Sequence, residues 1–156
     1  MIQGLAHVAI KTDNLERTVR FYTEILQLWL TERPPFDFPG AWLSTADPAQ
    51  DLVHVYAGGP GLREDGTAFV GSAAVDHFAM HAVGYQECRR RFKKAGLEWR
   101  EQLVPATQRW QLFVYDPNGV MVELLFDGAR EEGPGPDMSP ERRYRPGVSF
   151  RATGGT

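Results

Sequence analysis

Residues 5–10 read Leu-Ala-His-Val-Ala-Ile and residues 75–80 read Val-Asp-His-Phe-Ala-Met, so the chain holds two short apolar segments of one pattern, each with a single histidine. Their histidines, His7 and His77, are separated by 70 residues. The same shift aligns three further pairs of large side chains: Leu15 with Tyr85, Tyr22 with Phe92, and Trp29 with Trp99. An ordered match of this kind at a fixed separation indicates an internal repeat.

The repeat continues further along the chain with a shift of 69, which aligns Asp47-Pro48 with Asp116-Pro117 and His54 with Glu123. A deletion of one residue in a loop explains the change of shift, because loops tolerate such changes. His54 and Glu123 are therefore predicted to occupy equivalent places in the last strand of each half. A register error of one residue would turn His54 to the other side of its strand.

Each half is predicted to form a strand, a helix and then three strands. The helices are expected at about 13–28 and 85–95, because apolar residues recur there at helical spacing. Asp13 with Glu16 resembles a capping box, Gly96 is a helix stop, and Asn118-Gly119 is a hairpin signal. The expected strands are 5–11, 28–33, 41–45, 51–57, 75–82, 98–103, 109–115 and 120–126. The predicted fold class is therefore α+β, with two βαβββ modules at about 4–57 and 74–127.

Composition fits one soluble domain, residues 1–127, followed by a tail of different character. The chain has 156 residues, is 42% hydrophobic, and carries a formal net charge of −3. A single cysteine, Cys88, excludes an intramolecular disulfide and a Cys-rich zinc module. There is no long apolar run, secretory signal or basic footprint, so we expect a cytoplasmic protein without membrane or nucleic-acid partners.

Residues 128–156 form a tail rich in Gly, Pro and Arg that lacks a sustained apolar period. It is interpreted as a flexible tail or as an arm lying over a partner subunit, with Tyr144, Val148 and Phe150 as anchors. A role as an active-site lid ranks below both interpretations.

Four residues of the repeat have the chemistry of a divalent metal site: His7, His54, His77 and Glu123. Transition metals prefer imidazole nitrogen and carboxylate oxygen. If each half contributes its first and last strand to a shared cavity, the four side chains meet there. Glu123 lies in the apolar segment Val-Met-Val-Glu-Leu-Leu-Phe at 120–126, where an uncompensated buried carboxylate would cost several kcal/mol.

Structural roles compete with functional ones at each of these positions. A single histidine in a strand is more often a hydrogen-bonded residue than a ligand, and only the joint pattern favours the metal site. His81 either lines the pocket or lies in solvent at a strand end, and the second is favoured. Asp76 is expected in a surface turn, with the orientation of a metal ligand as the alternative, and Cys88 is expected in the core.

The residues resemble the vicinal oxygen chelate superfamily, which comprises glyoxalases, bleomycin-resistance proteins and extradiol dioxygenases. The segments that carry the resemblance include Arg-Phe-Tyr-Thr-Glu-Ile-Leu-Gln-Leu at 20–28 and Asp-Pro-Asn-Gly-Val-Met-Val-Glu at 116–123, together with the two histidine strands. It covers about residues 4–127. The resemblance implies a curved sheet, with half-barrels around a central metal cavity, usually in a homodimer.

The resemblance also implies a chemistry, in which a divalent ion (Fe, Ni, Co, Mn or Zn) binds two oxygens of a small substrate. In members similar to glyoxalase I, a metal-bound glutamate moves a proton beside a carbonyl, and that role would fall to Glu123. His54 stands where those members place Glu or Gln, which puts a two-carboxylate proton shuttle in doubt.

Two other enzyme classes of the superfamily share part of this ligand pattern. Extradiol dioxygenases use two His and one Glu on iron, matching His7, His77 and Glu123, but they place a tyrosine where this chain has Phe113. Tyr115 is the candidate substitute for that tyrosine. Fosfomycin-resistance transferases need a threonine at the position of Ala9 and rank third.

The leading hypothesis is a metal-dependent lyase or isomerase of the glyoxalase type, with an iron(II) extradiol dioxygenase as the alternative. A metal-free small-molecule binding protein is the competing class. Four aromatic residues are candidates for an apolar substrate wall, with core or dimer contacts as the competing role: Phe36, Phe38, Trp42 and Trp110. Arg109 is interpreted as a solvated strand-end residue, with pairing to a substrate carboxylate as the alternative. The sequence leaves open whether the cavity is built from one chain or two.

Overall fold

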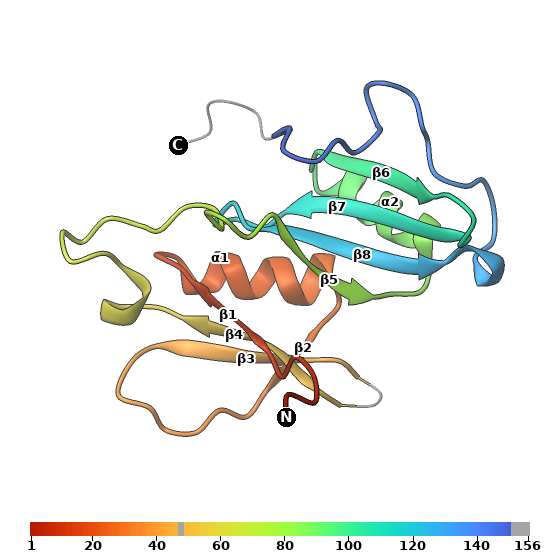
Figure 1. Ribbon diagram of the computed structural model, residues 1–156. Coiled ribbons are helices and arrows are strands. Elements are labelled where there is room, and N and C mark those ends of the chain that lie inside the picture. Colours follow the sequence, from red (N-terminus) through yellow and green to blue (C-terminus); the bar gives the residue numbers. More distant parts are fainter. Residues whose placement is uncertain (47–48, 151–156) are drawn as a thin grey trace. The chain divides into compact units, whose positions relative to one another are not determined.

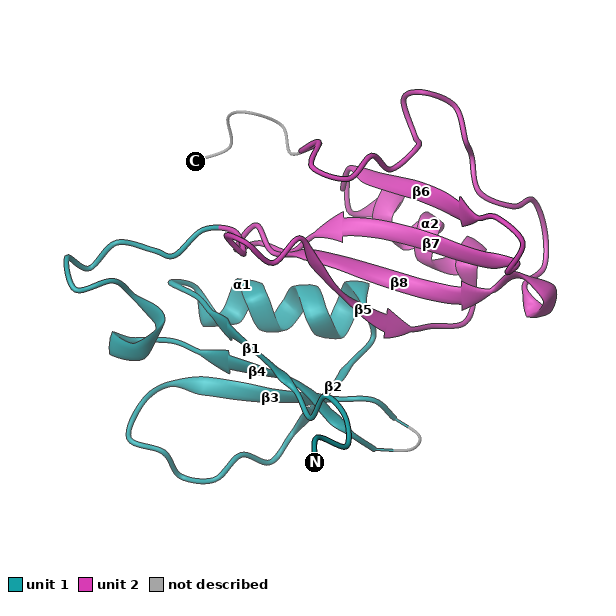
Figure 2. Ribbon diagram, viewed as in Figure 1, with its two compact units in different colours: residues 1–70 teal, residues 71–156 magenta. Residues whose placement is uncertain are grey.

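The computed structural model describes residues 1–46 and 49–150, and the chain divides into two compact units, Met1–Val70 and Gly71–Thr156 (Figure 2). The Asp47-Pro48 turn of the internal alignment and residues 151–156 of the tail lie outside the described residues.

The first unit is one βαβββ module with a four-stranded sheet in the order β1-β4-β3-β2 (Figure 1). Its elements are β1 (Val8–Lys11), α1 (Leu15–Arg20), a π-helical turn (Phe21–Ile25), β2 (Trp29–Thr31), β3 (Gly40–Ser44), β4 (Asp51–Tyr56) and a 3-10 turn (Gly59–Gly61). Strands β1 and β4 pair in parallel, and the other neighbours are antiparallel.

The second unit repeats the arrangement, with the sheet order β5-β8-β7-β6. Its elements are β5 (His77–His81), α2 (Tyr85–Lys94), β6 (Trp99–Val104), β7 (Arg109–Tyr115), β8 (Met121–Asp127) and a 3-10 turn (Gly128–Arg130). The predicted α+β class with two βαβββ modules is therefore confirmed. Both sheets are open and four-stranded, and neither closes into a barrel.

Strand pairing gives the two modules the same register. Ala9 lies opposite His54 between β1 and β4, and Ala79 lies opposite Glu123 between β5 and β8. Since Ala9 and Ala79 each follow a repeat histidine by two residues, this register agrees with the shifts of 70 and 69 found in the sequence. Residues paired in register point to the same sheet face, so the side chains of His54 and Ala9 lie on one face.

One face of each sheet is buried against its helix. The other face carries the candidate ligands. In the second unit, Val122, Leu124 and Phe126 alternate with Glu123 and are buried, and the Phe126 ring meets the α2 residue Tyr85 at 5.2 Å. In the first unit, the buried Val53 and Val55 alternate with His54 in the same way. Period-two alternation thus separates the core from the candidate ligands.

The first helix differs from its predicted bounds at both ends. Asn14, rather than Asp13, is the N-cap, because its side-chain Oδ1 accepts from the backbone N–H of Arg17 at 2.9 Å. Glu16 does not complete a capping box and instead pairs with Arg20 at 2.9 Å. After Arg20 the helix widens into a π turn, where the N–H of Leu26 reaches the carbonyl of Phe21 at 3.2 Å.

The first strand begins at Val8, although residues 5–11 were expected to be extended. Leu5 is exposed, and β1 finds its first partner on β4 at the Val8–Val53 pair. His7 therefore lies just ahead of the hydrogen-bonded strand, on the side given by Ala9.

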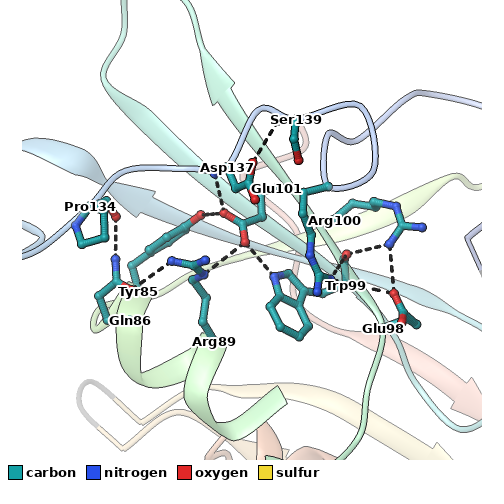
Figure 3. A network of polar contacts seen from close by, with 11 residues as sticks. Tyr85, Gln86, Arg89, Glu98, Trp99, Arg100, Glu101, Pro134, Asp137 and Ser139 are labelled. Carbon is teal, nitrogen blue, oxygen red and sulfur yellow. Dashed lines mark hydrogen bonds and ion pairs between the residues drawn. The ribbon is translucent and has the colours of Figure 1, made fainter. Parts of the chain in front are cut away.

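The described part of the tail packs on the second unit. Its path crosses from the α2 side, past the edge strand β6, to the opposite face of the sheet (Figure 1). Glu101 of β6 accepts a hydrogen bond from the backbone N–H of Asp137 at 2.8 Å (Figure 3). The backbone N–H of Glu101 donates to the carbonyl of Arg142, and its carbonyl accepts from the N–H of Tyr144. Tyr144 and Phe150 are buried, whereas Val148 is 57% exposed. A dimer arm remains a prediction.

Glu131, at the start of this tail, caps α2. Gly84 occupies the N-cap position of α2 in a left-handed conformation and has no side chain to offer, whereas the Glu131 carboxylate accepts from the N–H groups of Gly84 (3.0 Å) and Tyr85 (2.7 Å). We expect Glu131→Ala to lower the free energy of unfolding by about 1 kcal/mol, the usual cost of a lost N-cap. Urea denaturation measures this change. Glu132→Ala, at an exposed neighbour, is the control, and equal effects of the two variants would contradict the capping role.

Candidate functional site

His7 and His54 come together in the first unit. Their rings stack with centroids 3.8 Å apart and an angle of 17° between planes. Trp42 on β3, the register partner of His54, stacks on His54 as well, at 4.4 Å and 8°. Burial lowers the pKa of His54, and the nearby His7 lowers it further. Both effects favour the neutral imidazole, which has a lone pair to offer.

His77 and Glu123 come together in the second unit. Glu123 is 4% exposed, and its Oε2 lies 2.8 Å from Nε2 of His77. Its other oxygen, Oε1, accepts a hydrogen bond from the Gln111 amide at 2.6 Å. The buried carboxylate is therefore compensated at both oxygens, as the sequence required.

The second ring nitrogen of His77 is also held. Nδ1 lies 2.7 Å from Oδ1 of Asp76, a residue that was expected to be an ordinary turn residue. With Nδ1–H donated to Asp76, Nε2 of a neutral ring and Oε2 of Glu123 are both lone-pair donors. At 2.8 Å they need a shared proton or a shared cation between them. The donor types and their convergence fit a divalent metal ion.

Tyr144 is a site neighbour that sequence reasoning identified only as a tail anchor. Its ring stacks on Phe113 at 3.8 Å and 11°, and its hydroxyl donates a hydrogen bond to Oδ1 of Asp76. Burial, followed by this hydrogen bond, raises the pKa of Tyr144. The same bond is the largest cause that lowers the pKa of Asp76, and His77 adds to it. No periodicity in the tail would have indicated this docking position.

A cavity of about 220 Å³ lies in the second unit beside this cluster. Asp76, Tyr115 and Tyr144 give its polar lining, and Val75, Met121 and Val148 contribute apolar surface. Met121 is the register partner of His77, so the cavity adjoins the candidate ligand pair.

Three of the four predicted wall aromatics contact one another in the first unit, and Trp110 belongs to the second. Phe36 contacts both Phe38, at 5.6 Å, and Trp42, at 6.3 Å, in the first unit. Trp110 shares a sheet face with Phe126 and packs on Tyr85 of α2, opposite the face of Glu123. Trp110 is therefore wrong as a wall residue, because strand alternation places it in the helix-side core.

Three other predicted positions agree with the structure. His81 and Arg109 are exposed at strand ends, and Cys88 is buried in α2. Burial raises the pKa of the Cys88 thiol, which fits a core residue rather than a nucleophile.

Within residues 1–46 and 49–150, the candidate ligands form two pairs, and no three His, Cys, Asp or Glu side chains there are grouped to hold an ion. His7 pairs with His54, and His77 pairs with Glu123. Asp76 touches the far nitrogen of His77, so it orients that ring rather than adding a third donor.

The sequence places the chain in a known superfamily. The sequence model of the Glyoxalase/Bleomycin resistance protein/Dioxygenase superfamily matches residues 4–124. The chain belongs to this superfamily. The match contains all four candidate ligands and ends before the tail.

Three solved structures have a fold similar to that of this chain. A glyoxalase family protein from Bacillus anthracis matches with a TM-score of 0.63 and 19% identity, covering 81% of this chain and 96% of the other. A lactoylglutathione lyase from Agrobacterium tumefaciens has a TM-score of 0.58 and 16% identity, with coverages of 83% and 97%. The antibiotic binding protein TnmS3 from Streptomyces sp. CB03234 has a TM-score of 0.54 and 15% identity, with coverages of 80% and 96%.

These structural neighbours include an enzyme and a binding protein, so the fold alone does not select between the two classes. No curated protein sequence matches the chain significantly. In the part of the chain that the structure describes, no helix has the length and apolar character needed to cross a membrane.

Proposed function

We propose that the protein is a metal-dependent enzyme of the glyoxalase type, in which His7, His54, His77 and Glu123 hold one divalent ion. The proposal is carried by the 2.8 Å approach of Glu123 Oε2 to His77 Nε2 at a buried position. The shared register, which places His54 at the equivalent position of the other module, supports the full set of four.

Such an ion would supply Lewis-acid stabilisation of negative charge on a substrate oxygen. Fe, Ni, Co, Mn and Zn all suit a donor set of imidazoles and one carboxylate. We propose that the protein works as a homodimer, as superfamily members often do, and its mass in solution tests this.

Glu123 is the proposed base. It is the one carboxylate of the proposed ligand set, and the Gln111 amide fixes its Oε1 at 2.6 Å. A carboxylate held in this way can take a proton from carbon next to a carbonyl and return it to a neighbouring carbon. His54 stands where a second carboxylate would be, so we propose a single-base transfer rather than a two-carboxylate shuttle.

The proposed substrate is a small oxygenated molecule. The cavity of about 220 Å³ is smaller than the roughly 300–1,000 Å³ typical of drug-sized ligand pockets. Its lining combines Met121 and two tyrosine rings with polar groups, which suits a compact molecule with both apolar and oxygen-bearing parts.

An iron(II) extradiol dioxygenase is the second candidate, and one observation favours it. The tyrosine that such enzymes place at the position of Phe113 is absent, but Tyr144 stacks on Phe113 and brings a phenol next to His77. A metal-free binding protein is the third candidate, and in it a shared proton rather than a cation would join Glu123 to His77.

Proton exchange tests the leading proposal. Metal-loaded protein is incubated in deuterated water with small α-hydroxycarbonyl compounds, and proton NMR follows deuterium entry beside the carbonyl. We expect exchange with the natural protein and its loss in Glu123→Gln, because this substitution removes both the proposed base and a charged ligand of the ion. Removal of a general base by itself usually costs about 10²–10⁴-fold, so the expected loss is at least that large. Oxygen uptake with catechol and iron(II), without proton exchange, would instead indicate the dioxygenase.

A further inference from the structure

The C-terminal segment 131–150 docks on the second unit although it lies beyond residues 4–124, where the family match ends. Its contacts are specific. The backbone N–H of Tyr144 donates to the carbonyl of Glu101 at 2.9 Å, and the N–H of Glu101 donates to the carbonyl of Arg142 at 2.8 Å. These bonds attach the segment to the free edge of β6 and deliver the Tyr144 side chain to the opposite sheet face.

Asp76 is the point at which this segment meets the candidate metal site. Its carboxylate accepts a hydrogen bond from the Tyr144 hydroxyl of the segment. The same carboxylate holds Nδ1 of His77 at 2.7 Å, and His77 Nε2 faces Glu123 at 2.8 Å. A continuous chain of polar contacts therefore runs from Tyr144 to Glu123.

Asp76 stands just ahead of β5 with a half-exposed side chain, and in the described part of the chain its one side-chain hydrogen bond from outside the segment is with His77. The Tyr144 hydroxyl adds a second contact from the segment, and stacking on Phe113 at 3.8 Å fixes the plane of the Tyr144 ring. We infer that Tyr144 is a positioning residue that orients His77 through Asp76, so that Nε2 is presented to the ion. The role in metal binding rests on the proposed function, whereas the contacts among Tyr144, Asp76 and His77 do not depend on it.

The expected effect follows from other metal sites. Outer partners of a ligating histidine fix its tautomer and ring orientation, and their loss usually costs about 10–100-fold in metal affinity. Tyr144→Phe removes the hydroxyl and keeps the ring on Phe113, so we expect about tenfold weaker binding with little change in thermal unfolding.

The experiment uses the full chain and two measurements. Calorimetric titration with Co²⁺ alone gives the affinity of the natural protein, Tyr144→Phe, Asp76→Asn and the double variant. Nitrogen-15 NMR of the imidazole rings in metal-free protein reports which nitrogen of His77 carries the proton. Tyr56→Phe, which removes a hydroxyl in the first unit, is the matched control.

We expect the metal-free natural protein to hold His77 predominantly with the proton on Nδ1, and Tyr144→Phe to shift this tautomer ratio. We also expect the double variant to bind Co²⁺ no more weakly than Asp76→Asn, because both changes break one chain of contacts. Additive losses, or a Tyr144→Phe tautomer ratio equal to that of Tyr56→Phe, would overturn the inference. If the natural protein binds no Co²⁺, the proposed function fails, while the tautomer measurement still decides the role of Tyr144.

Discussion

Glu123→Gln is expected to abolish stoichiometric binding of a divalent ion. The substitution keeps the shape of the side chain and removes the only negative charge among the four proposed ligands. Loss of an outer partner alone costs about 10–100-fold in metal affinity, so removal of the charged ligand itself is expected to cost more. His77→Ala removes the nitrogen 2.8 Å from Glu123 and is expected to have a comparable effect.

Elemental analysis of protein purified without chelator measures the bound metal. Glu24→Gln is the control, because it makes the same chemical change at a largely exposed side chain on the first helical segment, whereas Glu123 is buried. Full metal content in both Glu123→Gln and His77→Ala would refute the site. His7→Ala and His54→Ala test the other pair separately, and retention of metal in these two variants would remove only that pair from the ligand set.

Glu101→Ala is expected to lower the free energy of unfolding by about 3–5 kcal/mol, because it leaves the buried Tyr85 and Trp99 donors without their acceptor and each unsatisfied buried group costs about 1–3 kcal/mol. Glu101 is completely buried on β6 (Figure 3). Its carboxylate accepts hydrogen bonds from Tyr85 (2.6 Å), Trp99 (2.8 Å) and the backbone of Asp137 (2.8 Å), and it forms an ion pair with Arg89 at 3.1 Å. This loss is a large fraction of the roughly 5–15 kcal/mol that stabilises a typical domain.

Urea denaturation checks this second prediction, and Glu98→Ala provides its control. Glu98 lies on the same stretch of chain but is 62% exposed, and it pairs with Arg100 and Arg142 at 3.3 and 3.8 Å. Exposed ion pairs contribute only about 0–1 kcal/mol. Equal losses in the two variants would contradict a special role for Glu101. Because Glu101 also holds Asp137, we expect faster proteolysis within residues 131–150 in Glu101→Ala.

The two-module architecture was predictable from the sequence because the same local patterns of apolar residues occur in both halves. The order of elements followed from period-two alternation around His7 and His77 and from helical spacing at 85–95. The repeat predicted that His54 and Glu123 occupy equivalent positions. Details at element ends were less predictable. Asn14 took the capping role expected of Asp13, because neighbouring Asx side chains compete for the same N–H groups.

By itself, then, the sequence determined two βαβββ modules and the sheet face on which each candidate ligand lies, since alternation along a strand is a local property of the chain. Only the tertiary structure decided that Tyr144 reaches Asp76, that Asp76 holds His77, and that Glu101 is buried under residues 131–150. The tail has no period to mark its contact surface, and Glu101 stands among charged neighbours that suggest a solvated strand. The Tyr144–Asp76 and Asp137–Glu101 contacts join residues 68 and 36 positions apart, and such pairings depend on the packed fold rather than on local spacing.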